Sequence, residues 1–316
     1  MEFGLYDIVS LFGALAFFIY GMKVMSEGIQ RAAGSQLRNI LRSMTRHRIL
    51  GILTGFLTTA VVQSSSATTV MTVSFVNAGL ITLTESAGIM MGANVGTTVT
   101  GWLVSVLGFN VRLHTLSLPL LMVGVPMLLA KRGKLRYWGE FIIGFSLLFL
   151  GLYFLQTTMP DIRNNSEALA WLSRFTDKGL LSRMFFVLVG TLITIVVQSS
   201  SAAMTLTLTM CYNGWLPFDV AAAMVLGENI GTTITAEVAA LVGNSEARRS
   251  ARIHSLFNLI GVFWMILLLP FVINGLASVL ISFGYSDPFT STVSLPVAIS
   301  AFHSFFNIAN VLLLFG

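Results

Sequence analysis

A short polar motif, Gln-Ser-Ser-Ser-Ala, occurs twice inside long apolar stretches of the sequence, at residues 63–67 and 198–202. Each copy is followed at the same distance by a second polar cluster, Asn-x-Gly-Thr-Thr, at 94–98 and 229–233. The same offset therefore relates Gln63 to Gln198 and Asn94 to Asn229. Polar groups are costly inside a lipid bilayer, so a duplicated set of them within apolar sequence predicts a transport site.

The composition is that of an integral membrane protein. Of the 316 residues, 55% are hydrophobic and only 10% are charged, whereas a soluble domain has about 25% charged residues. Long apolar runs predict membrane-spanning helices rather than a barrel, whose strands would alternate. The formal net charge is +5, but the basic residues cluster at the ends of apolar segments, so no nucleic-acid partner is expected. The apolar segments are 5–25, 49–81, 86–107, 115–130, 137–155, 185–216, 220–242, 253–281 and 295–315.

Three basic loops predict how the chain is threaded. Loops 26–48, 131–136 and 243–252 are rich in arginine or lysine, which favours the cytoplasmic side and leaves the N-terminus outside and the C-terminus in the cytoplasm. All three loops lie inside only if segments 49–81 and 185–216 each return to the face from which they enter. Both are therefore expected to be re-entrant helical hairpins, whose tips must be buried in protein or line a wet cavity.

The fold class we predict is an all-α polytopic membrane protein with two inverted-topology repeats, each with a re-entrant helical hairpin and a broken transmembrane helix. An odd number of crossings separates the hairpins, which inverts the second relative to the first. Segments 63–100 and 198–235 align without a gap and are identical at more than a third of their positions. The expected units are a first repeat at 1–136, a second at 137–281 and an additional C-terminal transmembrane helix at 282–316.

Two polar loops carry further expectations. Segment 156–182 is predicted to lie outside. Segment 27–48 has apolar residues among its arginines, so it is either an amphipathic helix on the inner surface or a solvated basic loop.

The serines of the duplicated motif predict an anion site. A serine at each hairpin tip can cap the helix that follows, which directs free backbone N–H groups and the positive end of the helix dipole into the membrane. The inverted copy brings a second helix start from the opposite face. The candidate residues for binding a tetrahedral oxyanion are Ser64, Ser65, Ser66, Ser199, Ser200 and Ser201.

Bound cations are expected beside the anion. Neither hairpin contains lysine or arginine, and two helix ends supply only about half a charge each. Side-chain oxygens of the motifs suit a hard cation such as sodium, and unwound carbonyls at 92–96 and 227–231 would complete its shell. The candidate sodium-binding residues are Gln63, Asn94, Thr97, Thr98, Gln198, Glu228, Asn229, Thr232 and Thr233.

Several other polar residues admit a structural interpretation. Glu228 replaces Ala93 of the first copy and is a cation ligand, a proton site or an acceptor that supports the broken helix. Glu140 and Glu237 are expected to pair locally. A His-x-x-x-Asn pattern starts at His254 and again at His303. Its members share a helix face, and we expect interhelical hydrogen bonds rather than a metal site, because no third ligand is evident. No cofactor is expected.

The sequence resembles the type II sodium/phosphate cotransporter family, its bacterial branch in particular. The family's QSSS-A-T pattern matches residues 63–68, and its QSSS-A matches 198–202. Its G-x-N-x-G-T-[TS] pattern matches 92–98 and 227–233, and the segment 20–28 is similar to its first helix and the exit of that helix. The second copy departs from the first, with Ala203-Met204 in place of two threonines, so a ligand role of those threonines is not shared.

The resemblance implies sodium-driven uptake of inorganic phosphate across a bacterial inner membrane by an elevator-like or rocking movement. It also implies that the QSSS and GxNxGT residues lie at the ion and phosphate sites. Many bacterial members carry a PhoU-like cytoplasmic domain after the last helix, and the apolar C-terminal end suggests that the chain is part of a longer protein. The oligomeric state is not fixed by the sequence, and a homodimer is one expectation.

Other functions remain open on the residues alone. Helix-end donors do not fix the anion, so a transporter of sulfate or a dicarboxylate, coupled to sodium or protons, is the nearest alternative. A phosphate-binding membrane sensor is another, although two inverted half-sites favour alternating access. An enzyme is disfavoured, because neither hairpin holds a histidine or lysine that could activate a serine.

Overall fold

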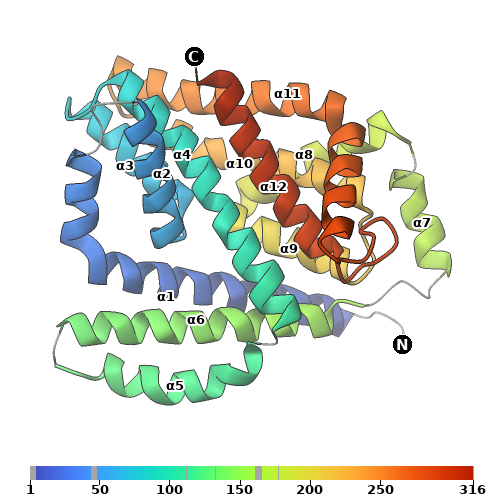
Figure 1. Ribbon diagram of the computed structural model, residues 1–316. Coiled ribbons are helices and arrows are strands. Elements are labelled where there is room, and N and C mark those ends of the chain that lie inside the picture. The colour runs from blue at the N-terminus through green and yellow to red at the C-terminus, as the bar shows by residue number, and fades with distance from the viewer. Residues whose placement is uncertain are drawn as a thin grey trace.

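The computed structural model describes residues 5–43, 48–111, 113–131, 133–160, 166–176 and 178–315, and every regular element in these ranges is a helix. Figure 1 shows their arrangement. The helices are α1 (Leu5–Ser43), α2 (Arg48–Val62), α3 (Ser65–Asn77), α4 (Leu83–Trp102), the π-helix η1 (Leu103–Asn110), α5 (His114–Leu128), α6 (Gly133–Thr158), α7 (Ser166–Thr176), α8 (Leu180–Val197), α9 (Ser200–Tyr212), α10 (Phe218–Ala240), α11 (Ser245–Ser282) and α12 (Leu295–Leu314).

The protein is a multi-pass membrane protein. Six helical stretches of the described chain are long and apolar enough to cross a bilayer, and their bounds are Leu5–Ala33, Leu83–Phe109, Gly133–Thr158, Leu180–Val197, Ser245–Ser282 and Leu295–Leu314. Two shorter apolar helices, Ile49–Val62 and His114–Leu128, accompany them. A bilayer core needs about 20 residues of helix, so these two are too short to span it upright.

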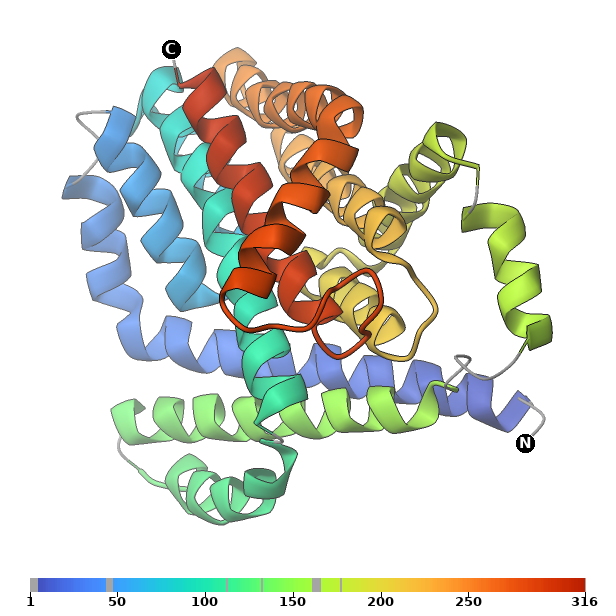
Figure 2. The ribbon, with the colours of Figure 1, turned by 45° about the vertical axis from the view of Figure 1, so that its right-hand side comes forward.

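A long antiparallel pair, α1 and α6, forms one side of the molecule, with α5 on the far side of α6 (Figures 1 and 2). Glycines let the two backbones approach closely. A Cβ added at Gly21 would meet the backbone of Leu148, and one at Gly144 would meet the backbone of Met25. The same contact is thus made twice, once from each helix. Small residues at such crossings are typical of packing between membrane helices.

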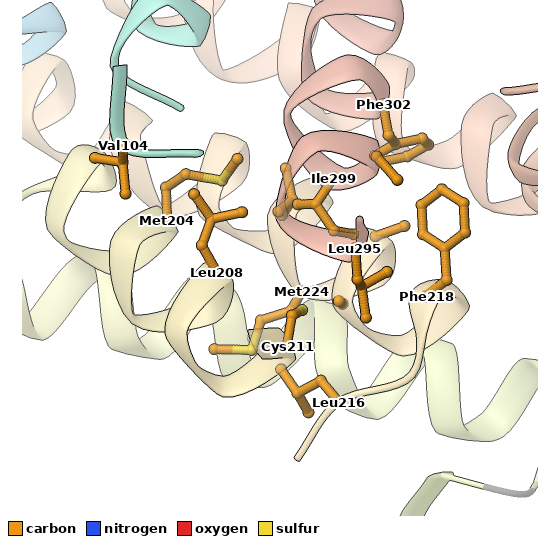
Figure 3. Close-up of a cluster of buried hydrophobic side chains, with 14 of the residues drawn as sticks. Val104, Met204, Leu208, Cys211, Leu216, Phe218, Met224, Leu295, Ile299 and Phe302 are labelled. Carbon is orange, nitrogen blue, oxygen red and sulfur yellow. The ribbon is translucent and has the colours of Figure 1, made fainter. Parts of the chain in front are cut away.

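The remaining helices form a second group around the helix pairs α2–α3 and α8–α9. Helix α2 packs along α4 and α8 packs along α10, while α11 and α12 cover both pairs. The largest buried cluster of apolar side chains extends from α1 and α6 through α9, α10 and α12 to α11, and Figure 3 shows Leu208, Met224 and Ile299 within it. Helix α11 contains Pro270, which interrupts helical hydrogen bonding and accounts for the bend of α11 in Figure 1.

Two helix–break–helix segments share one local geometry. Helix α2 ends before Gln63 and α8 ends before Gln198, and these are the two non-glycine residues of the described chain with positive φ, 56° and 54°. Ser64 and Ser199 then cap α3 and α9, which are both 13 residues long. Identical motifs therefore fold into identical breaks, because a left-handed residue followed by an N-capping serine reverses the helix direction.

The prediction of broken helices at 92–96 and 227–231 is wrong. Helices α4 and α10 run through both glycine clusters without a break. The glycines serve close packing instead, since a Cβ at Gly92 would meet the carbonyl of Ile52, and one at Gly227 would meet that of Val187. Because the backbone there stays helical, it provides no unwound carbonyls for a cation.

Several predicted boundaries are corrected as well. Helix α8 starts at Leu180 rather than near residue 185, because it takes in the apolar residues that precede the predicted segment. Segment 27–43 is the helical end of α1, so a loop over that range is wrong, while its place on the inner surface stays a prediction and residues 44–47 lie outside the described residues. Most of the basic loop 243–252 is the first part of α11, which Asn244 caps.

The polar segment 156–182 contains the short helix α7, which was not predicted from the sequence. Residues 161–165 and 177 of that segment lie outside the described residues.

Candidate functional site

The serines of the duplicated motif lie at the starts of α3 and α9. Ser64 Oγ accepts a hydrogen bond from the backbone N–H of Ala67 at 3.2 Å, and Ser199 Oγ accepts one from Ala202 at 3.2 Å. Ser65, Ser200 and Ser201 are buried, while Ser64, Ser66 and Ser199 are half-buried. A serine therefore caps each of the two helix starts, as the sequence predicts.

A hydrogen-bonded chain joins the two hairpin tips. Thr100 of α4 donates its hydroxyl proton to Gln63 Oε1 at 2.9 Å. Ser201 of α9 donates to Thr100 Oγ1 at 3.4 Å. Gln63 Nε2 donates to the carbonyl of Ala60 at 2.6 Å, which fixes the amide. Two motifs that are far apart in the sequence are thus brought into one site by a threonine between them.

The equivalent residues of the other half are arranged differently. Ser66, Gln198 and Thr235 correspond to Ser201, Gln63 and Thr100, and they line a cavity of about 480 Å³ between α3, α8 and α10. The side chain of Gln198 is exposed. Thr235 donates its hydroxyl proton to the carbonyl of Thr232 in its own helix, at 3.0 Å. One copy of the contact is closed, and the other is open.

The four predicted threonine ligands make equivalent bonds in both halves. Thr97 and Thr232 donate to the carbonyls four residues earlier, at 3.0 and 2.8 Å. Thr98 and Thr233 donate to the carbonyls three residues earlier, at 2.7 and 2.8 Å. Because each hydroxyl proton is already used, the oxygen lone pairs remain available, which suits a cation and not an anion.

The two predicted asparagine ligands differ in their surroundings. Asn94 donates to Asn258 Oδ1 at 2.9 Å, and its Oδ1 lies 3.0 Å from His254 Nε2. This pair of bonds confirms that the first His-x-x-x-Asn pattern joins helices. Asn229 makes a long bond of 3.4 Å to the carbonyl of Val225 in its own helix. In the second pattern, Asn307 instead donates to the carbonyl of His303 within α12 at 3.0 Å, and its Oδ1 atom is buried without a partner.

Glu228 is buried in α10 and accepts a hydrogen bond from Thr207 of α9 at 2.6 Å. None of the ion pairs among the described residues includes it. A buried carboxylate without a cationic neighbour attracts a cation or a proton. Glu140 pairs locally with Arg136 at 3.7 Å, and it also pairs with Arg31 of α1 at 3.1 Å. Glu237 accepts a hydrogen bond from Ser255 of the neighbouring helix α11 at 2.6 Å.

Sequence reasoning missed Thr100, Thr207 and Thr235. Thr100 and Thr235 stand at equivalent positions at the end of the aligned repeat, so the duplication itself could have identified them. Thr207 is repeated as well, since Thr72 stands at the equivalent position of the first copy, but only the structure places Thr207 beside Glu228. In the part of the chain that the structure describes, no cluster of three histidine, cysteine or acidic side chains could hold a metal ion.

Comparison with known proteins gives one family. The Na+/Pi-cotransporter family model matches residues 17–157 and 164–286. A Salmonella typhimurium protein named as an inorganic phosphate export protein, YjbB, is 32% identical over 309 residues, which are 96% of this chain and 52% of that protein. The Bacillus subtilis protein YqeW is 28% identical over 268 residues, 84% of this chain and 82% of YqeW.

A more distant similarity reaches animal transporters. The human sodium-dependent phosphate transport protein 2B is 33% identical over 106 residues, 33% of this chain and 15% of that protein. The chain spans about half the length of the YjbB proteins that it matches. No solved structure matches the chain.

Proposed function

This chain belongs to the Na+/Pi-cotransporter family, and we propose that it is a sodium-coupled symporter that moves inorganic phosphate across the membrane by alternating access. The observation that carries the proposal is the chain of hydrogen bonds from Gln63 through Thr100 to Ser201. It links the residue that precedes the start of α3 to a serine at the start of α9, which supports a shared site, because neither helix start alone would make a sufficient anion site.

Phosphate is proposed to bind between the starts of α3 and α9. Two N-termini supply backbone N–H donors and positive partial charge, and hydroxyl donors surround them. The proposed ligands are Ser64, Ser65, Ser66, Ser199, Ser200 and Ser201, from half-buried or buried positions.

Sodium is proposed to bind beside the phosphate and to supply the charge that the hairpins lack. Threonine oxygens whose protons are already donated to helix carbonyls are suitable ligands, and the Glu228 carboxylate is the strongest attraction for a cation in the group. Anion and cation then stabilise each other's site, which makes transport of one depend on the other. The proposed ligands are Gln63, Asn94, Thr97, Thr98, Gln198, Glu228, Asn229, Thr232 and Thr233.

The proposed architecture is an inverted repeat in the inner membrane, with units at 1–136, 137–281 and 282–316. The N-terminus is outside, the C-terminus is cytoplasmic and both hairpins are re-entrant. The antiparallel packing of α1 on α6 and the equal geometry of the two breaks support this plan. A homodimer and a PhoU-like C-terminal domain are proposed from the family resemblance.

The direction of net transport has two candidates. Import follows when an inward sodium gradient drives a symporter. Export is favoured by the names of the YjbB relatives, which match 96–97% of this chain. The direction that a symporter takes depends on its gradients, so both are tested by reversing the sodium gradient.

The test is uptake of radiolabelled phosphate into proteoliposomes, with an inward sodium gradient compared with an equal choline gradient. Wild-type protein should accumulate phosphate only with sodium, and the Gln63→Ala, Gln198→Ala double variant should lose this accumulation. Asn274→Ala, which changes an exposed amide on α11, is the control and should transport normally. An outward sodium gradient applied to phosphate-loaded vesicles should drive efflux.

Competition identifies the anion. Unlabelled phosphate and arsenate should reduce uptake strongly, whereas sulfate and succinate should not. Sodium-dependent uptake of sulfate or succinate instead would identify the alternative transporter. Binding of phosphate without flux in folded protein would indicate a sensor, and sodium-independent uptake driven by a pH gradient would indicate proton coupling through Glu228.

A further inference from the structure

The two halves of the site present the same three residues in different states. The closed triad is Gln63, Thr100 and Ser201, whose members are joined by hydrogen bonds of 2.9 and 3.4 Å. The open triad is Gln198, Thr235 and Ser66, and each member stands at the equivalent position of the other repeat. No hydrogen bond joins the members of the open triad among the described residues, and a cavity of about 480 Å³ lies between them.

The difference extends to the residues around each triad. Ala67 and Val238 line the cavity beside the open triad, and Val238 is 57% exposed. The counterpart of Ala67 is Ala202, beside the closed triad, and it is 0% exposed. Identical motif residues therefore lie in a solvent-sized space on one side and in packed protein on the other.

The threonine is the member whose hydrogen bond changes between the two states. Thr100 directs its proton across the helix interface to Gln63. Thr235 directs its proton back to the carbonyl of Thr232, three residues earlier in the same helix. A threonine hydroxyl in a helix has both options by rotation about χ1. The same residue can thus either tie a hairpin tip to its neighbour or release it.

We propose that the two triads are the two gates of the transport pathway, and that the hydroxyls of Thr100 and Thr235 are the ties that hold them closed. One triad then closes as the other opens during transport. This rests on the proposed function, because only a transporter needs two gates that are never open together. With both triads open, the cavity would continue through the site, and with both closed, the ligands would be trapped. Equal residues in the two triads allow equal contacts, so a small free-energy difference decides which one forms.

The test uses matched single-cysteine reporters in a Cys211→Ala background, since Cys211 is the only native cysteine. Ala67→Cys reports on the open side and Ala202→Cys on the closed side. Both are read by the rate of reaction with a charged, membrane-impermeant thiosulfonate reagent in proteoliposomes opened to reagent on both faces. Without ligands, Ala67→Cys should react at least about tenfold faster, because a minor state holds about 10% or less of the population.

Removing one tie should shift the two reporters in opposite directions. Thr100→Val keeps the side-chain shape and removes the hydroxyl, so Ala202→Cys should react faster and Ala67→Cys more slowly. Thr235→Val should instead leave Ala67→Cys fast and Ala202→Cys slow. Thr100→Ser, which restores a hydroxyl, should return both rates to those of the background. A merely structural loss in Thr100→Val would raise both rates together and would overturn the proposal, as would equal rates at the two reporters.

Flux in the same vesicles separates this proposal from the function on which it rests. Sodium-dependent phosphate uptake with reporters that do not move reciprocally would overturn the gate exchange alone. If the two reaction rates change in opposite directions but no phosphate is taken up, the exchange of the gates is supported and the proposed substrate or coupling is wrong. The Cys211→Ala background must first show the uptake of the wild type.

Discussion

At the scale of single residues, Gln63 and Gln198 have the same backbone and different surroundings. Their φ angles are 56° and 54°, so the strain of a left-handed residue is the same in both, about 1–2 kcal/mol. Only Gln63 makes a bond across the helix interface, to Thr100. A comparison of the two positions therefore isolates the side-chain contact from the backbone.

We predict that Gln63→Gly is less stable than Gln198→Gly by about 1 kcal/mol, the usual contribution of one hydrogen bond. Glycine relieves the left-handed strain equally at both positions, but at position 63 it also removes the bond to a buried threonine, which contributes about 0.5–1.5 kcal/mol. The measurement is thermal unfolding of the two variants in the same detergent. Equal midpoints for the two variants would show that the Gln63–Thr100 contact does not stabilise the protein.

The sequence predicted where the helices of the candidate site begin better than it predicted the hydrogen bonds between them. Serine after a left-handed glutamine is a local signal, and both caps form as expected. The joining of Gln63 to Ser201 through Thr100 depends on where α4 lies relative to α9, which no local pattern contains. The difference between the two triads could not be predicted from the sequence, because the two motifs have identical residues while their hydrogen bonds differ.

At the scale of helices, the glycines of this chain decide where backbones touch. Glycine in a membrane helix has two possible meanings: a break in the helix or a close approach to another helix. The sequence does not distinguish them, and the breaks expected at Gly92 and Gly227 are close approaches instead. A continuous helix keeps its carbonyls bonded, so the proposed sodium ligands in α4 and α10 are side chains alone.

We predict that Gly21→Ala and Gly144→Ala each destabilise the protein by about 1–3 kcal/mol, the usual cost of overpacking. Each new methyl group would meet the backbone of the facing helix, which cannot move aside as a flexible side chain would. Gly13→Ala, in the same helix as Gly21, is the control, since nothing lies within 4 Å of its added Cβ. The free energy of unfolding in detergent is the readout, and a loss at Gly13 as large as that at Gly21 would contradict the explanation.

Helices α11 and α12 have similar positions relative to the two helix–break–helix segments. Helix α11 packs against α3, α4 and α10, and α12 packs against α9, α10 and α4. Each carries one His-x-x-x-Asn pattern, starting at His254 and His303. Helix α12 therefore stands to the second hairpin much as α11 stands to the first.

At the scale of the whole molecule, the charge distribution predicts which helix ends lie on which side of the membrane. Lys134 and Arg252 belong to basic segments and Glu167 to the polar segment between α6 and α8, and all three are exposed. The positive-inside rule places the first two in the cytoplasm and the third outside.

We predict that cysteines at these positions label from opposite sides. In the Cys211→Ala background, Glu167→Cys should react with an impermeant maleimide in intact cells. Lys134→Cys and Arg252→Cys should react only in inverted membrane vesicles. Labelling of Lys134→Cys and Glu167→Cys from the same side would contradict the topology, because α6 would then not cross the membrane.

Much of the global fold could be predicted, since apolar length and charge are properties of whole segments. All nine expected apolar segments are helical in the structure, the two longest as pairs of helices. The helix boundaries that depend on contacts between distant parts of the chain could not be predicted. Helix α11 extends through its basic loop because Asn244 caps it and also binds Asn77 at the end of α3. Such a long-range partner cannot be recognised from local polarity.

The contact between α1 and α6 has a consequence for ancestry. Gly21 against Leu148 and Gly144 against Met25 are one contact made twice, so the interface is isologous, of the kind that identical subunits make with each other. A half-length chain bearing such a helix could meet its own copy through this surface, but only if two copies entered the membrane in opposite orientations. Fusing two such halves into one polypeptide removes that requirement, and each half is then free to differ, as Ala93 and Glu228 do at equivalent positions.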